Sequence, residues 1–198
     1  MGLLSWFTGR KEQRSALKDP DSWLKSAFSG SPTGSGEKVT TETALQQPAV
    51  FACVRVISED LASLPCKVYK RLGNGRESIE SHPIARLLQK SPNPEMTPFT
   101  FKETLTGHIL LWGNAYAEIE RNGAGQPVAL WPLMPDKMQL KIVDHELIYI
   151  YDNRLIFSSD KILHIKGLGT DGIQGYSPIA YARETIGISQ ALERSGAT

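Results

Sequence analysis

Residues 164–178 read HIKGLGTDGIQGYSP, and the glycines at positions 167, 169 and 172 fit the pattern G-x-G-x-x-G. The residues just before them, 161–166, have the alternation of a β-strand. A strand that leads into such a turn is typical of a dinucleotide-binding site. The stretch therefore has two interpretations, a nucleotide cofactor site or a loop whose backbone needs glycine for another reason.

The start of the next helix argues against the cofactor. In a dinucleotide site the helix begins within the glycine motif, so that its first N–H groups face the pyrophosphate. Here residues 173–177 separate Gly172 from a helix predicted to begin at Pro178, with Ser177 as its cap. The remainder is predicted to be helical, without a second parallel strand. We expect the glycines to let a long surface loop turn sharply and lie against another part of the protein.

Other patterns of catalytic or metal-binding chemistry are absent from the sequence. The four histidines, at positions 82, 108, 145 and 164, lack the spacing of metal ligands. We expect His108 and His164 to be satisfied core residues. The acidic pairs Glu59–Asp60 and Glu118–Glu120 fit solvent-facing charges. The sequence therefore predicts no catalytic residue, no cofactor and no metal.

Charge balance limits the possible partners. The 198 residues include 22 basic and 21 acidic side chains, a formal net charge of +1. Tight binding of nucleic acid normally needs a basic excess on one face, so we expect at most loose contact with DNA. No apolar run is long enough for a membrane span. Cys53 and Cys66 lack metal spacing and are expected to be buried free thiols of a protein in a reducing compartment.

The chain divides into two regions at about residue 44. Residues 1–44 contain the run GSPTGSG at 30–36 and few periodic apolar positions, so we predict a flexible N-terminal arm. Its aromatic residues could dock on a partner, on a neighbouring copy or on the same chain; they are Trp6, Phe7, Trp23 and Phe28. Residues 45–198 are predicted to form one ordered domain.

Helices and hairpins alternate in this domain without a strand–helix–strand rhythm, which indicates the α+β class. Apolar spacing predicts helices over residues 48–64, 82–89, 97–112 and 178–194. The first is expected to turn Val50, Cys53, Val54, Ile57, Leu61 and Leu64 inward, and the last Ile179, Ala182, Ile186 and Leu192. Strands are predicted at residues 66–71, in hairpins over 115–133 and 138–151, and at 162–165.

Several stretches, taken in order, resemble the N-terminal part of the portal proteins of long-tailed double-stranded DNA bacteriophages. The resemblance spans roughly residues 44–198. It rests on AVFACVRVISEDLASLP (49–65), HP (82–83), LL (87–88), SPN (91–93), LLWGNAYA (110–117), LWPLMP (130–135), ILHI (162–165) and DGIQGYSP (171–178).

The resemblance implies a structural protein without an active site. Such portal proteins form a ring of twelve at one capsid vertex of the virion, assembled in the host cytoplasm. DNA passes through the ring non-specifically, and its partners are the large terminase subunit, the capsid or scaffold protein and the head–tail connector. This segment would be the wing, ending in a helix that leads toward the stem, with the stem, clip and crown largely absent. The chain is then expected to be a fragment, a truncated prophage product or one piece of a split portal.

Alternating side chains suggest where subunits could meet. The polar face of the hairpin over residues 115–133 would present Glu118, Glu120 and Arg121 to a neighbouring subunit, or simply to solvent. The glycine loop would be a flexible connection that delivers the last helix toward the ring axis. Two other functions remain open, a head–tail adaptor and a nucleotide-dependent oxidoreductase.

Overall fold

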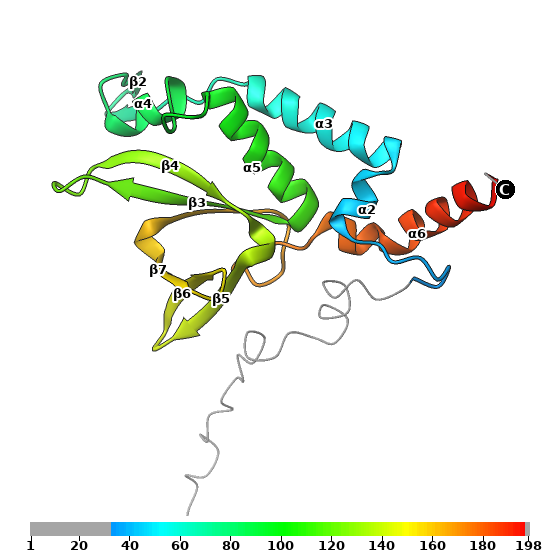
Figure 1. The fold of residues 1–198 in the computed structure, drawn as a ribbon. Coiled ribbons are helices and arrows are strands. Elements are labelled where there is room, and N and C mark those ends of the chain that lie inside the picture. Colours follow the sequence, from blue (N-terminus) through cyan, green and yellow to red (C-terminus); the bar gives the residue numbers. More distant parts are fainter. Residues whose placement is uncertain (1–32, 197–198) are drawn as a thin grey trace, which may run out of the picture.

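The computed structural model describes residues 33–196 (Figure 1). Its helices are α2 (Thr41–Leu45), α3 (Pro48–Ser63), α4 (Pro83–Gln89), α5 (Pro98–Trp112), α6 (Pro178–Gly196) and the 3-10 turns Pro135–Lys137 and Ser159–Lys161. Its strands are β1 (Tyr69–Leu72), β2 (Gly75–Ser78), β3 (Asn114–Arg121), β4 (Pro127–Leu133), β5 (Met138–Val143), β6 (Glu146–Tyr151), β7 (Leu155–Ser158) and β8 (Ile162–Lys166). They form three sheets, β1–β2, β4–β3–β8 and β5–β6–β7, and every strand pair between residues 33 and 196 is antiparallel. The α+β prediction is confirmed.

Strand β3 is the centre of the fold, and its first four residues are all buried. Ala115 and Ala117 pack on one face against Phe101 and Leu105 of α5. Tyr116 points to the other face, into a second cluster with residues of β5–β8. Figure 1 shows the two layers, with α5 on one side of β3 and the β5–β6–β7 sheet on the other. The sequence predicts one apolar and one polar face for this hairpin. That prediction is wrong for the first half of β3, where both faces are buried.

Local signals placed the ends of α5 correctly. Thr97 accepts a hydrogen bond from the Thr100 N–H, Pro98 occupies the first turn, and Gly113 ends the helix with φ = 76°. The hairpin turn at Asp144 and His145 is also as predicted, and both residues have positive φ. Strand β7 was not predicted; it pairs with β6 after a turn at Asp152 and Asn153.

Helix α3 packs differently from the prediction. Its buried residues are the small Ser58 and Ala62, and a Cβ built on Gly107 of α5 would lie 3.8 Å from the Ser58 Oγ. Because small residues let α3 approach α5 closely, several larger apolar residues of α3 stay outside. The inward prediction holds for Val50 and Val54, which are half-buried against the cluster that contains Leu111. Exposed side chains include Phe51, Ile57, Leu61 and Leu64. Cys53 and Cys66 are exposed as well, so the expectation of buried thiols is wrong.

Residues 33–45 belong to the folded domain, so the predicted boundary at residue 44 lies too far along the chain. Val39 and Ala44 are 3% and 0% exposed, in one cluster with Ile179 and Ile186 of α6. The low apolar content of this segment favours an arm, but its apolar residues Val39 and Ala44 are buried. Residues 1–32, which include the four aromatic residues of the predicted arm, lie outside the described part of the chain. None of the described helices is long and apolar enough to cross a membrane.

Candidate functional site: the joint between the central sheet and the last helix

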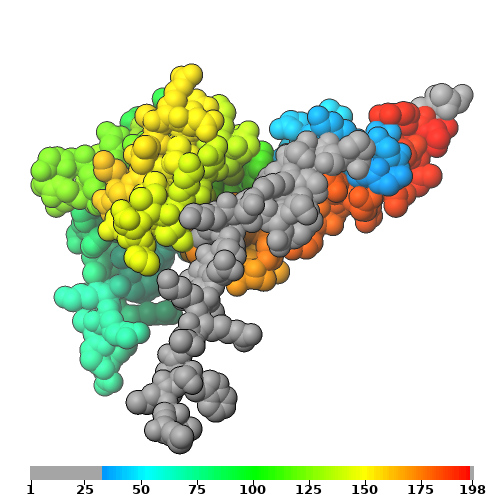
Figure 2. Space-filling view, turned by 90° about the horizontal axis from the view of Figure 1, so that it is seen from below, coloured from blue at the N-terminus to red at the C-terminus, as the bar shows by residue number. Residues whose placement is uncertain are grey.

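Helix α6 extends away from the two layers (Figures 1 and 2), and its attachment begins where α5 turns into β3. We call the contacts between this corner, at Gly113 and Asn114, and the loop of residues 167–177 the joint. Gly113 has φ = 76°, and a Cβ there would lie 2.1 Å from the Tyr176 carbonyl oxygen. The Gly167 N–H donates to the Gly113 carbonyl at 2.8 Å. The left-handed conformation and the close approach of two backbones both require glycine at this corner.

Asn114 joins the corner to the loop before α6. Its side chain is buried, and Nδ2 donates to the Gly175 carbonyl while Oδ1 accepts from the Gly175 N–H, both at 2.8 Å. This pair of bonds occupies both backbone groups of Gly175. Asn114 Nδ2 also lies 3.3 Å from the Trp112 carbonyl. An amide is the side chain that can donate and accept at once in this place.

His164 of β8 continues this network, and the network determines its tautomer. Because Asn114 Oδ1 acts as an acceptor, His164 Nε2, at 3.1 Å, must donate to it. Nδ1 then accepts from the Tyr149 hydroxyl at 3.3 Å. The imidazole lies 4.4 Å from the Tyr116 ring centre. Burial, helped by the nearby Lys166 charge, lowers the pKa of His164 to about 4, so the ring is neutral at pH 7.

Close packing explains three glycines of the loop, at positions 167, 169 and 175, whereas Gly172 meets nothing within 4 Å and is required by its φ of 68°. A Cβ on Gly169 would lie 2.2 Å from the Gln174 carbonyl oxygen, and one on Gly175 would lie 2.1 Å from that of Gly113. Asp171 Oδ1 accepts from the N–H groups of Ile173 and Gln174, which closes the turn. The expectation that this loop lies against another part of the protein is confirmed. The expectation of a flexible connection is wrong, because the loop is bonded along its length.

Ser177 completes the joint and takes the place that a phosphate would need. Its Oγ donates to the Leu111 carbonyl at 2.7 Å and accepts from the Ala180 N–H at 3.1 Å, which caps α6. In addition, β8 pairs antiparallel with β3. A dinucleotide site needs an open helix N-terminus after a parallel strand, so this geometry contradicts the cofactor interpretation.

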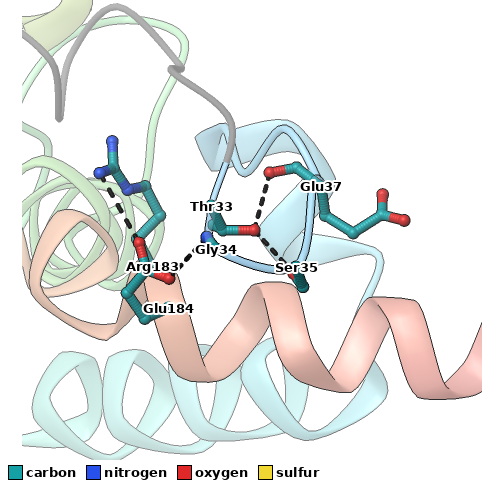
Figure 3. Close-up of polar contacts among 6 residues, drawn as sticks. All are labelled: Thr33, Gly34, Ser35, Glu37, Arg183 and Glu184. Atoms are coloured by element: carbon teal, nitrogen blue, oxygen red, sulfur yellow. Dashed lines mark hydrogen bonds and ion pairs between the residues drawn. The ribbon is translucent and has the colours of Figure 1, made fainter.

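A second set of contacts fixes α6 further along its length (Figure 3). Glu184 accepts a hydrogen bond from the Gly34 N–H at 3.0 Å. Glu37, whose backbone carbonyl accepts from the Thr33 hydroxyl, forms an ion pair with Arg194 at 2.8 Å. A Cβ on Gly187 would lie 2.6 Å from Thr33 Oγ1, so glycine lets the segment reach the helix. The orientation of α6 is therefore set at two places.

The predicted contact residues lie at the far end of β3. Glu118 is half-buried and Glu120 is exposed, and the Trp131 Nε1–H donates to Glu120 Oε2 at 2.8 Å. Arg121 points to the opposite face, since side chains alternate along a strand. It donates to the carbonyls of Gly125 and Asp160 of its own chain. Two acidic residues, without Arg121, thus form the outward row, and their contact with another subunit stays a prediction.

Asn93 is a buried anchor that sequence reasoning did not single out. Its Nδ2 donates to the Leu130 carbonyl at 2.8 Å, and its Oδ1 accepts from the Glu95 N–H at 3.0 Å. The Leu130 N–H donates to the Pro92 carbonyl at 2.7 Å. These bonds satisfy both backbone groups of Leu130 on the side of β4 that faces away from β3. The only available signal was the run SPN itself, which is typical of a turn. Among the described residues no group of His, Cys, Asp or Glu is arranged to hold a metal ion.

Comparison with known proteins identifies the family. The family model described as "Phage portal protein" matches residues 48–198. This chain belongs to the phage portal protein family. The portal protein of Enterobacteria phage HK97 is 36% identical over 204 residues, which cover 96% of this chain and 45% of that protein. The probable portal protein of Streptomyces phage phiC31 is 33% identical over 181 residues, 84% of this chain and 39% of that protein.

A solved structure agrees with the family assignment. A chain in the virion of a native gene transfer agent particle superimposes with a TM-score of 0.61 at 25% identity, over 87% of this chain and 50% of that one. The resemblance found in the sequence is therefore confirmed. The chain spans about half the length, or less, of the curated portal proteins it matches.

Proposed function

We propose that this chain is the N-terminal, wing part of a portal ring subunit, located at the portal vertex of a virion and assembled in the host cytoplasm. It acts by shape and performs no catalysis. In the ring, a set of twelve copies surrounds the path of double-stranded DNA. The large terminase subunit, the capsid or scaffold protein and the head–tail connector bind to the assembled portal.

The observation that carries this proposal is the family match over residues 48–198, which includes every element of the joint. The joint is what a ring subunit needs mechanically. A helix that leads toward the centre of a ring must keep one angle to its wing, or the copies could not close a cycle of identical head-to-tail contacts. Asn114, Gly175 and Ser177 provide that fixed angle through buried hydrogen bonds.

Assembly of the purified chain tests the proposal. We expect native mass spectrometry and negative-stain electron microscopy at increasing concentration to show ring-shaped oligomers or their open precursors. A chain that stays monomeric at every concentration would contradict the proposal that these residues carry a ring contact. Saturable quenching of tryptophan fluorescence by NAD or ATP would contradict the proposed absence of catalysis and favour the oxidoreductase alternative.

A further inference from the structure

The β1–β2 hairpin, which follows α3, is a two-stranded sheet without a third strand. All eight residues of its strands are exposed. The corresponding part of the chain, coloured between cyan and green, projects from the body in Figure 2. A lone hairpin is marginally stable in water. Both of its faces are available to a partner.

The two faces of the hairpin differ in how their charges are paired. On one face Lys70 is directly opposite Glu77, a favourable cross-strand pair. On the other face Arg71 is directly opposite Arg76, and like charges in this position are destabilising. Tyr69 shares the second face, and the Arg76 guanidinium lies 4.9 Å from its ring centre. We call this second face the arginine face.

No acidic side chain offsets the arginine face. Among residues 33–196, neither Arg71 nor Arg76 forms an ion pair. Residues 67–77 contain four basic and one acidic side chain, a net charge of +3, whereas the whole chain has +1. The other residues together therefore carry a net charge of −2. The near-neutral net charge of the whole chain therefore includes a hairpin that is locally basic.

We propose that the arginine face binds phosphate groups of double-stranded DNA. Two guanidinium groups held on opposite strands can share one phosphate, which removes their repulsion and uses the paired donors of each arginine. The presence of duplex DNA near the hairpin rests on the proposed portal function. The isolated contact involves few cations, so it is weak, as suits DNA that must move. Because the contact is electrostatic, added salt weakens it further.

Duplex DNA fits this face better than an acidic protein segment does. DNA presents a charge about every 1.7 Å along its axis, so anions reach Arg71 and Arg76 without any match of sequence. A peptide would need an acidic residue at each matching position. A two-stranded ribbon is also narrow enough to enter the major groove of B-DNA.

The test measures binding of the whole chain to a short fluorescent duplex of arbitrary sequence by anisotropy, at several salt concentrations. We expect the double variant R71Q/R76Q to lose affinity about tenfold at low salt, and its plot of log affinity against log salt to be less steep by about 2. The control, K70Q/K141Q, removes the same charge at exposed positions off the arginine face. It should lose much less affinity.

A second variant separates binding from folding. Arg71→Glu places an opposite charge across from Arg76, so the hairpin should be at least as stable by urea unfolding. DNA binding should fall about as far as in R71Q/R76Q, because both variants leave the arginine face without net charge. Equal losses in R71Q/R76Q and K70Q/K141Q would overturn the proposal, because binding would follow net charge alone. Binding to polyglutamate but not to DNA would also overturn it, in favour of an acidic protein partner.

The outcome is independent of ring formation. If the wild type forms no oligomers but R71Q/R76Q loses DNA binding, the proposed ring is refuted and the proposed DNA contact of the arginine face is supported. If rings form and the variant binds DNA as the wild type does, the arginine face is refuted and the ring stands.

Discussion

The Asn114 side chain and the Gly175 backbone, 61 positions apart in the sequence, are joined by two hydrogen bonds of 2.8 Å that run in opposite directions. The arrangement imitates one rung of an antiparallel sheet, with a side-chain amide in place of a second backbone. It connects the buried start of β3 to the loop that leads into α6. At this first of its two attachment points, the angle of α6 therefore depends strongly on one amide.

Removal of this amide should loosen the helix. We expect Asn114→Ala to lower the free energy of unfolding by about 2–4 kcal/mol, because it leaves the Gly175 N–H and carbonyl buried without partners. Asn114→Asp should be similarly harmful, since a carboxylate cannot donate to the Gly175 carbonyl. Urea unfolding measures the loss, and faster hydrogen exchange at residues 175–177 locates it. Gln139→Ala, which removes an exposed amide, is the control; an equal effect there would refute the role of Asn114.

Substitution of the loop glycines tests their packing. Gly175→Ala and Gly169→Ala place a Cβ 2.1–2.2 Å from a backbone oxygen. Because backbone cannot move aside cheaply, each should cost about 3 kcal/mol or more in urea unfolding. Gly123→Ala meets nothing within 4 Å and should be nearly neutral. If alanine at Gly169 and Gly175 left the free energy of unfolding unchanged, the close backbone packing of the loop would be refuted.

Two buried histidines predict the acid sensitivity of the protein. Burial lowers the pKa of His108 to about 4, although the Asp136 charge opposes the shift. Burial and the Lys166 charge together lower the pKa of His164 to about 4. Since the unfolded chain binds protons below about pH 6.5 and the folded state does not, stability is complete above pH 6.5 and falls as the pH approaches 4. His108 contributes up to about 3 kcal/mol of this loss.

The variant His108→Leu isolates that contribution. His108 is 8% exposed and its Nδ1 has no hydrogen-bond partner within residues 33–196, so the expectation of a satisfied histidine is wrong and leucine should fit. We expect the urea midpoint of His108→Leu to change less between pH 7 and pH 4.5 than that of the wild type. The exposed control His145→Asn should keep the full pH dependence. If the urea midpoint of His108→Leu fell with pH as much as that of the wild type, His108 would not be a cause of the acid sensitivity.

The sequence predicted those features of the fold that neighbouring residues determine. Thr97, Pro98 and Gly113 fix the ends of α5 by capping, whatever surrounds the helix. The turn at Asp144 and His145 joins β5 to β6 in the same way. Strand β7 was not predicted, because its four residues give too few alternations of apolar and polar side chains to indicate a strand.

Features set by distant partners could not be predicted in this way. The apolar stripe of α3 predicts an inward face, which holds for Val50 and Val54. Further along the helix, a close approach to α5 buries Ser58 and Ala62 instead. Leu192 of α6 was expected inside and is 66% exposed, because that end of the helix meets residues 33–47 through polar side chains. The joint depends on Asn114 and Gly175, and no local pattern links two residues so far apart.

The exposed thiols give a rapid check of the α3 packing. Because Cys53 and Cys66 are both exposed, a thiol reagent should modify both in the native protein at rates close to those in the urea-unfolded chain. The single variants Cys53→Ser and Cys66→Ser assign each rate, and neither should change stability much. Protection of Cys53 in the native monomer would show that α3 turns the other way. Protection that appears only on oligomerisation would place α3 in a subunit contact.

The acidic row at the end of β3 yields the most direct prediction about assembly. Glu118 and Glu120 share one face of the strand, and neither has an ion pair within residues 33–196. If they meet a neighbouring subunit, the double reversal E118K/E120K should shift native mass spectra from oligomers toward monomer, because a reversed charge is repelled by the surface that attracted it. The control, E80K/E146K, makes the same change at two exposed positions elsewhere and should assemble normally. Unchanged oligomers in E118K/E120K would show that the row faces solvent in the ring.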